Sequence, residues 1–310
     1  MTERIQKSRT APSPKRRQCG AMAIYYGMIE QHPSFRTAQV SLEHAFTTRL
    51  RSAVALRTQP YKKIQVVVHV LYRTASENIS DAQIKSQITV LNRDFRATNP
   101  DKSKVPAVWT GLVADSLIGF ELASKAPNGS ATNGINRVQT TRTSFPADES
   151  MKSSATGGAN PWPRNKYLNI WVCRLGGGLL GYAQFPGGPK ATDGVVILNT
   201  AFGTKGTAAA PFNLGRTTTH EVGHFLNLRH IWGDTPDCSG SDLVADTPNA
   251  EDANFGKPTF PNVSCQNGPN GDMFMNYMDY VDDDSMFMFT PGQVARVQAT
   301  LDGPRRSLVA

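Results

Sequence analysis

Apolar residues gather in five short runs between residues 63 and 202, and each run has the length of a β-strand. In "KIQVVVHVLY" (63–72), Val and Ile dominate, as they do in buried strands, and His69 is expected to pack within the sheet. The Gly- and Pro-rich stretch "GGGLLGYAQFPGGP" is expected to connect the last two runs. The other runs are 117–123, 134–140, 166–175 and 193–202.

Helix signals lie on both sides of these runs. Ser80 and Gln83 are spaced as a capping box and predict a helix that continues to about Phe95. A second helix is expected to begin near Thr217, which can serve as its N-cap. A long loop-rich stretch then leads to "TPGQVARVQATL", where Thr290, followed by a proline, predicts a last helix. The pattern therefore predicts an α+β fold in which strands and a long helix precede an irregular half.

Positive charge is concentrated at one end of the chain. Residues 1–63 hold twelve Lys and Arg against three Glu, whereas the remainder holds twenty-one basic and twenty-two acidic residues. Because the body is close to neutral, a nucleic-acid-binding face is not expected. The basic end lacks clear periodicity apart from one expected helix in "GAMAIYYGMIEQH", and it is expected to be a separable leader.

No membrane span is expected, because the chain has no run of about 18 apolar residues. Its basic N-terminal stretch contains no apolar segment typical of a signal peptide. The protein is therefore either cytosolic or has lost such a segment.

Four cysteines are too few for a disulfide-rich scaffold. Cys238 and Cys265 flank a region rich in Gly, Asp, Asn and Pro, where little core is available, so we expect a disulfide between them. The alternative is two free thiols. Cys173 lies in the strand-like run "YLNIWVCRL" and is expected to be an inert buried thiol.

Three of the six histidines lie in "TTTHEVGHFLNLRHIWGD". His220 and His224 share one face of a helix, but His230 would point to the opposite side unless the helix ends between them. The HExxH pattern predicts two zinc ligands with Glu221 beside them, able to reach a zinc-bound water. A third histidine leaves the fourth position open, as a catalytic zinc requires. The alternative is a surface helix with incidental histidines.

The motif resembles that of the metzincin metallopeptidases, HExxHxxGxxH followed by a Met-turn. Asn227 stands where that family usually has Gly, and Asn is the next-best residue for the left-handed turn. "FMNYMDY" (274–280) resembles the Met-turn, with Met278 beneath the metal and Tyr280 two residues later. With the paired cysteines, these motifs resemble the pappalysin branch, especially its ulilysin-like members, over residues from about 17 to 303.

The resemblance implies a fold and a mechanism. The fold is a metzincin-like catalytic domain with a twisted mixed sheet, the active-site helix in an upper subdomain, and an irregular lower subdomain ending in a helix. We expect a pro-segment at 1–58 and subdomains at 59–230 and 231–310. Glu221 would accept a proton from the zinc-activated water and return it to the leaving amine, with Tyr280 assisting. Secretion or display at the cell surface, and protein or peptide substrates, follow from the same resemblance.

Two acidic segments carry further expectations from the resemblance. Asp283, in "YVDDDSM", would lie at the base of the pocket for the residue after the cut bond and select Arg or Lys; the alternative is a solvated turn. Structural calcium is implied near residues 241–252, with Asp242, Asp246 and Asp252 as ligands. A solvated acidic loop is the alternative there.

The leader contains a candidate latency device in "RRQCG". Cys19 resembles the pro-segment cysteine that occupies the fourth zinc position in this family, and the neighbouring Arg17 is expected to lower its pKa. A free surface thiol or a pairing with Cys173 are the alternatives.

The stretch before the first core strand lacks a buried pattern, as a cleavable linker should. Arg after the cut bond would permit self-cleavage there, and the alternative is another protease. The candidate bonds are Thr48–Arg49, Leu50–Arg51 and Leu56–Arg57. Two rival interpretations of the chain remain: a gluzincin, in which a distant Glu replaces the third histidine, and an inactive zinc-stabilised binding module.

Overall fold

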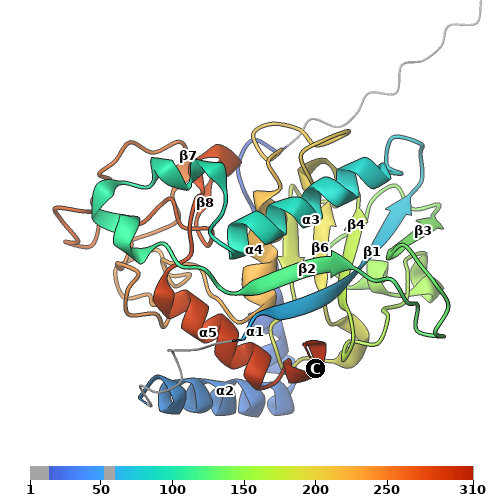
Figure 1. The fold of residues 1–310 in the computed structure, drawn as a ribbon, viewed down its shortest axis with the longest axis horizontal. Helices are drawn as coiled ribbons and strands as arrows, with labels where there is room; N and C mark the ends of the chain where they lie inside the picture. The colour runs from blue at the N-terminus through green and yellow to red at the C-terminus, as the bar shows by residue number, and fades with distance from the viewer. Residues whose placement is uncertain (1–13, 52–59, 310) are drawn as a thin grey trace, which may run out of the picture.

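A six-stranded sheet forms the centre of the computed structural model, which describes residues 14–51 and 60–309 (Figure 1). The five expected strands are present. A further strand, β5, lies inside the Gly- and Pro-rich stretch, so the prediction of a plain connection there is wrong. Its three residues are too few to give a periodic signal. The strands are β1 (Lys62–Tyr72), β2 (Ile118–Leu122), β3 (Ile135–Gln139), β4 (Leu168–Cys173), β5 (Gly181–Ala183) and β6 (Val195–Leu198).

Strand β1 organises the sheet, whose order is β2-β1-β4-β6-β5. On one side β1 pairs with β4, and on the other it pairs first with β2 and then with β3. All these pairings are parallel, and only β5 runs antiparallel, along β6. His69 is buried in β1 and bonds to Asn169 at 2.9 Å, which confirms its packing role. Burial lowers the pKa of His69 to about 4.

In the described residues, the body has three α-helices: α3 (Asp81–Phe95), α4 (Arg216–Phe225) and α5 (Pro291–Asp302). Ser80 accepts the Gln83 N–H at 3.2 Å and begins α3 as predicted. The Gln83 side chain does not complete a capping box, because it bonds to the loop that follows β6. At α5 both halves of the box with Thr290 are present, which confirms that helix start. Helices α3 and α4 lie against the sheet (Figure 1).

The leader forms two helices, α1 (Ala21–Gln31) and α2 (Pro33–Arg51), so the expectation of a single helix is wrong. Few apolar residues mark α2; Phe35 and Phe46 are the two aromatic side chains it buries. In Figure 1, blue α2 lies alongside red α5. Arg49 and Arg51 are in the last turn of α2, so the expected linker begins later than predicted. The third candidate, Arg57, lies outside the described residues.

The half after α4 is largely irregular, as predicted. It contains one small parallel ribbon, formed by β7 (Phe255–Gly256) and β8 (Tyr280–Val281). Cys238 and Cys265 are joined in a disulfide, and Cys173 is a buried free thiol, which confirms both expectations. A single hydrophobic cluster contains residues from the sheet, α4 and this irregular half, and these parts therefore pack as one core.

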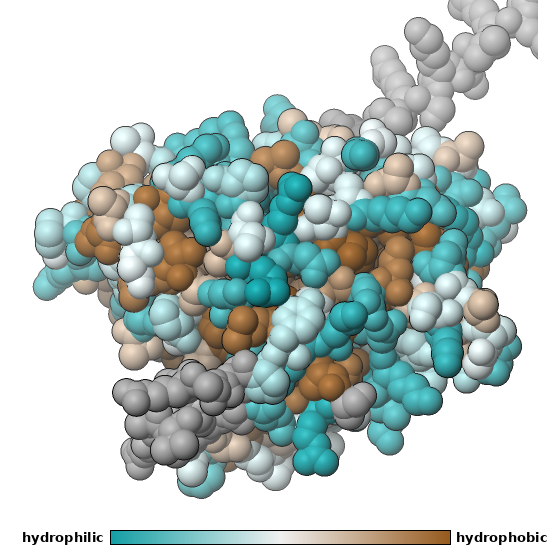
Figure 2. Space-filling model, in the orientation of Figure 1, coloured by the Kyte–Doolittle hydropathy of each residue, from teal (hydrophilic) through white to brown (hydrophobic). Residues whose placement is uncertain are grey.

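The outer face is mixed in character. Figure 2 shows small brown areas separated by hydrophilic side chains over the face seen in Figure 1. Among the helices of residues 14–51 and 60–309, none is both long and apolar enough to cross a bilayer.

Candidate metal centre and substrate pocket

The N-cap of helix α4 lies two residues earlier than the sequence indicates. Arg216 is the first residue of the helix and Gly215 precedes it with φ 80°, so Thr217 lies inside the helix and the predicted N-cap is wrong. Asp283, which lies far along the chain, caps the helix instead. Its Oδ2 accepts the N–H groups of Leu214 (2.8 Å) and Arg216 (3.2 Å). A carboxylate here also interacts favourably with the helix dipole.

Helix α4 ends between the second and third histidines, as their spacing predicts. Its last residue is Phe225, and Asn227 follows with φ 74°, the left-handed conformation expected at this place. The N–H of Leu228 donates to the Gly223 carbonyl at 2.9 Å and closes the turn. His230 is thereby brought back toward the histidine face of the helix.

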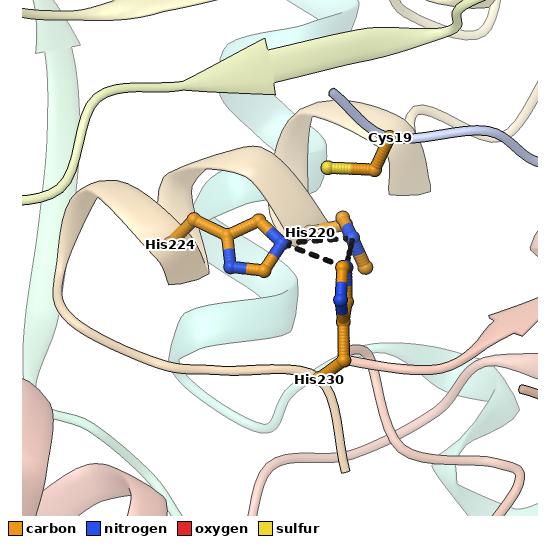
Figure 3. Close-up of side chains that lie close together, drawn as sticks. All are labelled: Cys19, His220, His224 and His230. Atoms are coloured by element: carbon orange, nitrogen blue, oxygen red, sulfur yellow. Dashed lines mark hydrogen bonds between the residues drawn. The ribbon is translucent and has the colours of Figure 1, made fainter. Parts of the chain in front are cut away.

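His220, His224 and His230 point their Nε2 atoms toward one another (Figure 3). The three Nε2–Nε2 distances are 3.2, 3.2 and 3.0 Å. In a tetrahedral zinc site with bonds of about 2.0–2.1 Å, ligand nitrogens lie about 3.3 Å apart. The arrangement therefore fits one zinc ion held by three imidazoles.

Each imidazole is oriented through its other nitrogen, which leaves Nε2 for a metal. The partners of the Nδ1 atoms are Tyr277 O for His220 (2.8 Å), Leu228 O for His224 (2.8 Å) and Asp234 Oδ1 for His230 (2.5 Å). Burial and the neighbouring imidazoles hold the pKa values of His220 and His224 well below the usual range. Both rings are therefore neutral, as metal ligands must be.

Glu221 lies beside these ligands on α4 and is only 1% exposed. Burial raises the pKa of its carboxyl to about 8, although the hydrogen bond from Cys19 and the charge of Arg17 act in the opposite direction. Its side chain packs closely on Gly181 of β5, where an added Cβ would lie 2.9 Å from Glu221 Cγ. A carboxyl group held in place with a pKa near neutral suits proton transfer in both directions.

The leader passes over the histidines and brings Cys19 to their open side (Figure 3). Its Sγ and the histidine nitrogens all lie within 4.8 Å of one another. The thiol donates to Glu221 Oε2 at 3.3 Å, and the backbone beside it pairs with β5 through Gly20 N–H and Gly181 O at 3.0 Å. Four potential ligands, one of them from the leader, are thus gathered at one place.

The leader also fills a buried pocket next to this group. Arg17 is 1% exposed, and its guanidinium donates to Asp283 Oδ1 (2.7 Å), Thr217 Oγ1 (3.0 Å) and Val281 O (3.2 Å). Its Cζ lies 5.0 Å from the ring centre of Phe212. Asp283 is fully buried, so the alternative of a solvated turn is wrong. Nothing in the sequence indicates that Arg17 would meet this carboxylate.

Arg17 does not act on the Cys19 thiol as the sequence predicts. Its guanidinium faces Asp283, while burial and the charge of Glu221 raise the pKa of Cys19 well above the usual range. The prediction of a thiol acidified by Arg17 is therefore wrong.

Met278 and Tyr280 lie at the metal centre. Met278 is fully buried beneath α4, and a Cβ added to Gly223 would lie 2.5 Å from its sulfur, so only glycine fits at that position of the motif. The ring of Tyr280 lies 4.8 Å from that of His230, and its hydroxyl donates to the Cys19 carbonyl at 3.4 Å.

Known proteins are similar to this chain in sequence. Residues 153–302 match the model of peptidase family M43, described as pregnancy-associated plasma protein-A. An extracellular metalloprotease of Pyricularia oryzae is 34% identical over 91% of this chain and 87% of its own length. An extracellular metalloprotease of Arthroderma gypseum is 31% identical over 83% of this chain and 81% of its own length. The chain belongs to the pappalysin family.

Solved structures agree with this assignment. Mature mirolysin of Tannerella forsythia, in complex with a cleaved peptide, is 49% identical with a TM-score of 0.80 and covers 81% of this chain and 97% of its own. A promirolysin mutant is 45% identical with a TM-score of 0.88, covering 94% and 97%. This pappalysin therefore has the predicted metzincin α+β fold and is a zinc-dependent metalloendopeptidase. The gluzincin and binding-module interpretations are set aside.

The carboxylates expected to bind calcium do not form one group in this pappalysin. Asp242 is buried and accepts the Thr247 hydroxyl at 2.7 Å. Asp246 accepts the Thr290 hydroxyl at 2.6 Å at the start of α5, and Asp252 is exposed. Within the described part of the chain, the cysteine–histidine group is the only set of three or more His, Cys, Asp or Glu side chains that could hold a metal ion together.

Two supporting residues are not singled out by the sequence. Asp234 orients His230, and its place four residues after the third histidine is a signal that could have found it. Arg216 is buried and donates to the Tyr277 hydroxyl at 2.8 Å and to Asp101 at 2.9 Å. Because the Tyr277 carbonyl orients a zinc ligand, Arg216 supports the centre from behind. Its partners are distant in sequence, so no local pattern indicates them.

Proposed function

We propose that this metalloendopeptidase cuts before arginine and that the chain is its latent precursor. The observation that carries the substrate preference is the pairing of Arg17 with Asp283, 2.7 Å apart and shielded from water. A cation held in this way next to the metal group occupies the place that a substrate side chain would take. The leader thus supplies a template for the side chain that follows the cut bond.

The pocket favours arginine over lysine. All three nitrogens of the Arg17 guanidinium have an acceptor: the Asp283 carboxylate, the Thr217 hydroxyl and the Val281 carbonyl. A planar guanidinium presents its N–H groups in a fixed fork, whereas the ammonium of lysine is a compact charge that cannot match all three acceptors. Phe212 adds a ring beneath the cation.

The chain's own residues carry the proton transfers. When bound, zinc supplies Lewis-acid chemistry that activates water and polarises the scissile carbonyl. His220, His224 and His230 would hold it. Glu221 takes a proton from the attacking water and delivers it to the leaving amine. Tyr280, beside the metal ligands, donates a hydrogen bond to the oxygen that becomes negative, and Met278 supports the ligands from below. No covalent acyl-enzyme forms.

Latency follows from the two leader contacts. Cys19 occupies the side of the histidine group that a substrate carbonyl needs, and Arg17 fills the pocket. The pairing of the leader with β5 holds both in place. We assign residues 1–58 to a pro-segment and the divisions 59–230 and 231–310 to the two catalytic subdomains. Promirolysin covers 94% of this chain, whereas mature mirolysin covers 81%. This difference supports such a pro-segment.

Maturation would occur at Thr48–Arg49, Leu50–Arg51 or Leu56–Arg57, each of which places an arginine after the cut bond. The first two lie in the final turn of α2, which would have to fray before cleavage. N-terminal mass spectrometry of the purified wild type and of Glu221→Ala tests this. A new N-terminus at one of these arginines in the wild type alone supports self-cleavage. Identical processing of the inactive variant in isolation contradicts it.

Secretion or surface display is supported by the disulfide and by relatives named extracellular metalloproteases. Structural calcium rests on the family resemblance alone. Thermal unfolding with and without a calcium-selective chelator tests it, and an unchanged Tm would remove calcium from the proposal.

One experiment tests the function itself. Two peptides that differ only in Arg or Lys after a single cleavable bond are incubated with the processed enzyme and with Glu221→Ala. The wild type should cut the arginine peptide at that bond, and the variant should cut neither. Equal cleavage of the two peptides would contradict the arginine preference, and cleavage by the variant would contradict the role of Glu221.

A further inference from the structure

The residue before Arg17 in the leader also has a partner on the enzyme body. The Cζ of Arg16 lies 4.7 Å from the ring centre of Phe255, within the range of a cation–π contact. Arg16 is exposed and Phe255 is half-buried, so the ring presents a face that solvent and ligands can reach. Consecutive arginines of the leader are thus held at two neighbouring places.

The β7–β8 ribbon connects the Phe255 ring with the pocket that holds Arg17. In β7–β8, Phe255 pairs with Tyr280 and Gly256 pairs with Val281. The Val281 carbonyl accepts the Nε–H of Arg17, and the Tyr280 ring lies against the Phe255 ring with centres 5.9 Å apart. Phe255 and the Val281 carbonyl of the arginine pocket therefore belong to the two paired strands of one ribbon.

The order of the leader residues indicates which substrate position would meet Phe255. Counted back along the leader, Cys19 lies at the metal group, Arg17 fills the pocket and Arg16 lies on Phe255. A substrate that follows the same places would therefore run in the opposite chain direction to the leader. In a substrate, the carbonyl to be cut lies at the metal and the next side chain enters the pocket. The chain then continues past the pocket, toward the place that Arg16 occupies.

We propose that Phe255 forms a second subsite, which takes a planar cationic side chain at the position directly after the pocket arginine. This rests on the proposed arginine pocket and extends it to a preference for an Arg-Arg pair following the cut bond. Arginine is the best occupant because its guanidinium stacks on an aromatic face, and lysine is second. Glutamate is disfavoured, because an anion meets the negative face of the ring and the edge of the ribbon carries Asp282, whose N–H bonds to Gly256.

The size of the effect follows from the exposure of the contact. An exposed cation–π pair changes kcat/KM by about two- to fivefold. That is smaller than the effect of the buried pocket, so the second position modulates cleavage that the first position permits.

The test uses the full chain, processed to its active form, and four peptides with identical flanks. Each has Arg in the pocket position and Arg, Lys, Ala or Glu directly after it. We expect kcat/KM for Arg to exceed that for Ala by about two- to fivefold. In Phe255→Leu this ratio should fall to about one, and Phe255→Tyr should retain it. Phe260→Leu, a partly exposed phenylalanine of the same loop-rich half, should not change it.

The possible results separate two failures. The peptide pair with Arg or Lys directly after the cut bond tests the pocket separately. If the wild type prefers Arg in that pair but cuts the four peptides equally, the second subsite is wrong and the pocket stands. The second subsite is also wrong if Phe255→Leu leaves the ratio of kcat/KM between the Arg and Ala peptides unchanged. If Arg in the pocket position is not needed either, the proposed function fails as well. Thermal unfolding of each variant shows whether a loss of activity comes from a loss of fold.

Discussion

The thiol of Cys19 donates a hydrogen bond to Glu221 Oε2 across 3.3 Å. A leader residue thus contacts the proton-transferring carboxylate while also facing the three histidine nitrogens. In the proposed latent form, this one side chain blocks both the metal position and the base. Removing it changes two contacts at once, whereas removing Arg17 empties the pocket and takes away a charge that lowers the pKa of Glu221.

We expect Cys19→Ala to yield a precursor that is active before its leader is cut. Cleavage of a quenched-fluorescence arginine peptide by the uncut variant measures this, with gel analysis to show that the leader is intact. Cys173→Ala is the matched control, because Cys173 is the other free cysteine and lies buried in β4. Equal latency of the Cys19 variant and the wild type would contradict the proposed switch.

Asp283→Asn should weaken cleavage before arginine by about ten- to one-hundredfold in kcat/KM, because a charge-assisted bond contributes about 1.5–3 kcal/mol. Asn retains an acceptor oxygen for the backbone at the start of α4, so the fold should survive. Thr217→Val is a companion variant that removes one acceptor and keeps the charge. Thr217→Val should reduce the difference in kcat/KM between arginine and lysine peptides. A full preference for arginine in Asp283→Asn would rule out the pocket.

Asp234→Asn should lower zinc affinity by about ten- to one-hundredfold, the usual effect of losing a residue that orients a ligand. The Asp234 carboxylate bonds to His230 Nδ1, and an amide is a poorer partner for a ligand that needs electron density. Competition with a chelator measures the affinity directly. Asp237→Asn provides the control, because Asp237 is exposed and bonds only to its own turn. Equal zinc retention by both variants would speak against the role of Asp234.

Glu43→Gln should speed release of the cut leader by about tenfold, since it removes the charge of the half-buried partner of a buried guanidinium, a cost of about 1.4 kcal/mol. Both Glu43 oxygens bond to Arg296 of α5, which is fully buried and lies 4.8 Å from the Phe46 ring. Native gels of the processed protein would follow the release. Glu30→Gln on α1 is the control, because Glu30 is exposed. Equal release rates in the two variants would show that this ion pair does not hold the leader.

Local signals were sufficient for most of the fold and for the zinc ligands. The strands, the cap at Ser80 and the helix start at Thr290 depend on neighbouring residues, as does the turn at Asn227. The errors share a different cause. Helix α2 is stabilised by packing on α5 and not by its own pattern, and the start of α4 is set by Asp283 from a distant segment. The pairing of Arg17 with Asp283 joins residues 266 positions apart, which no periodicity records.

The stability of the fold should depend on the protonation of Asp94. Asp94 is buried beneath α4, accepts the Thr219 hydroxyl at 2.6 Å and lies 3.3 Å from the Arg216 guanidinium. Burial raises the pKa of Asp94 to about 7, although Arg216 and Thr219 act in the opposite direction. In the unfolded chain the pKa of an aspartate is about 3.9.

The sign follows from these two values. Between about pH 4 and pH 7 the folded state binds a proton at Asp94 that the unfolded state has lost, so raising the pH lowers the free energy of unfolding. The contribution of this proton to the free energy of unfolding is complete below pH 4 and is lost as the pH rises through 7. The slope is at most about 1.4 kcal/mol per pH unit. Burial likewise raises the pKa values of Asp242 and Asp279 to about 7, and these groups add to the fall.

Urea unfolding of the full chain between pH 5 and pH 8 measures this slope. Asp94→Asn keeps an acceptor for Thr219 and removes the titrating group, so its free energy of unfolding should fall less steeply with pH than that of the wild type. Asp237→Asn should not change the decrease in the free energy of unfolding with rising pH. Hydrogen bonds from Ser239 lower the pKa of Asp237, so this group titrates below the measured range. If the slopes of Asp94→Asn and the wild type coincide, Asp94 is ionised throughout, and Arg216 outweighs the burial that raises its pKa.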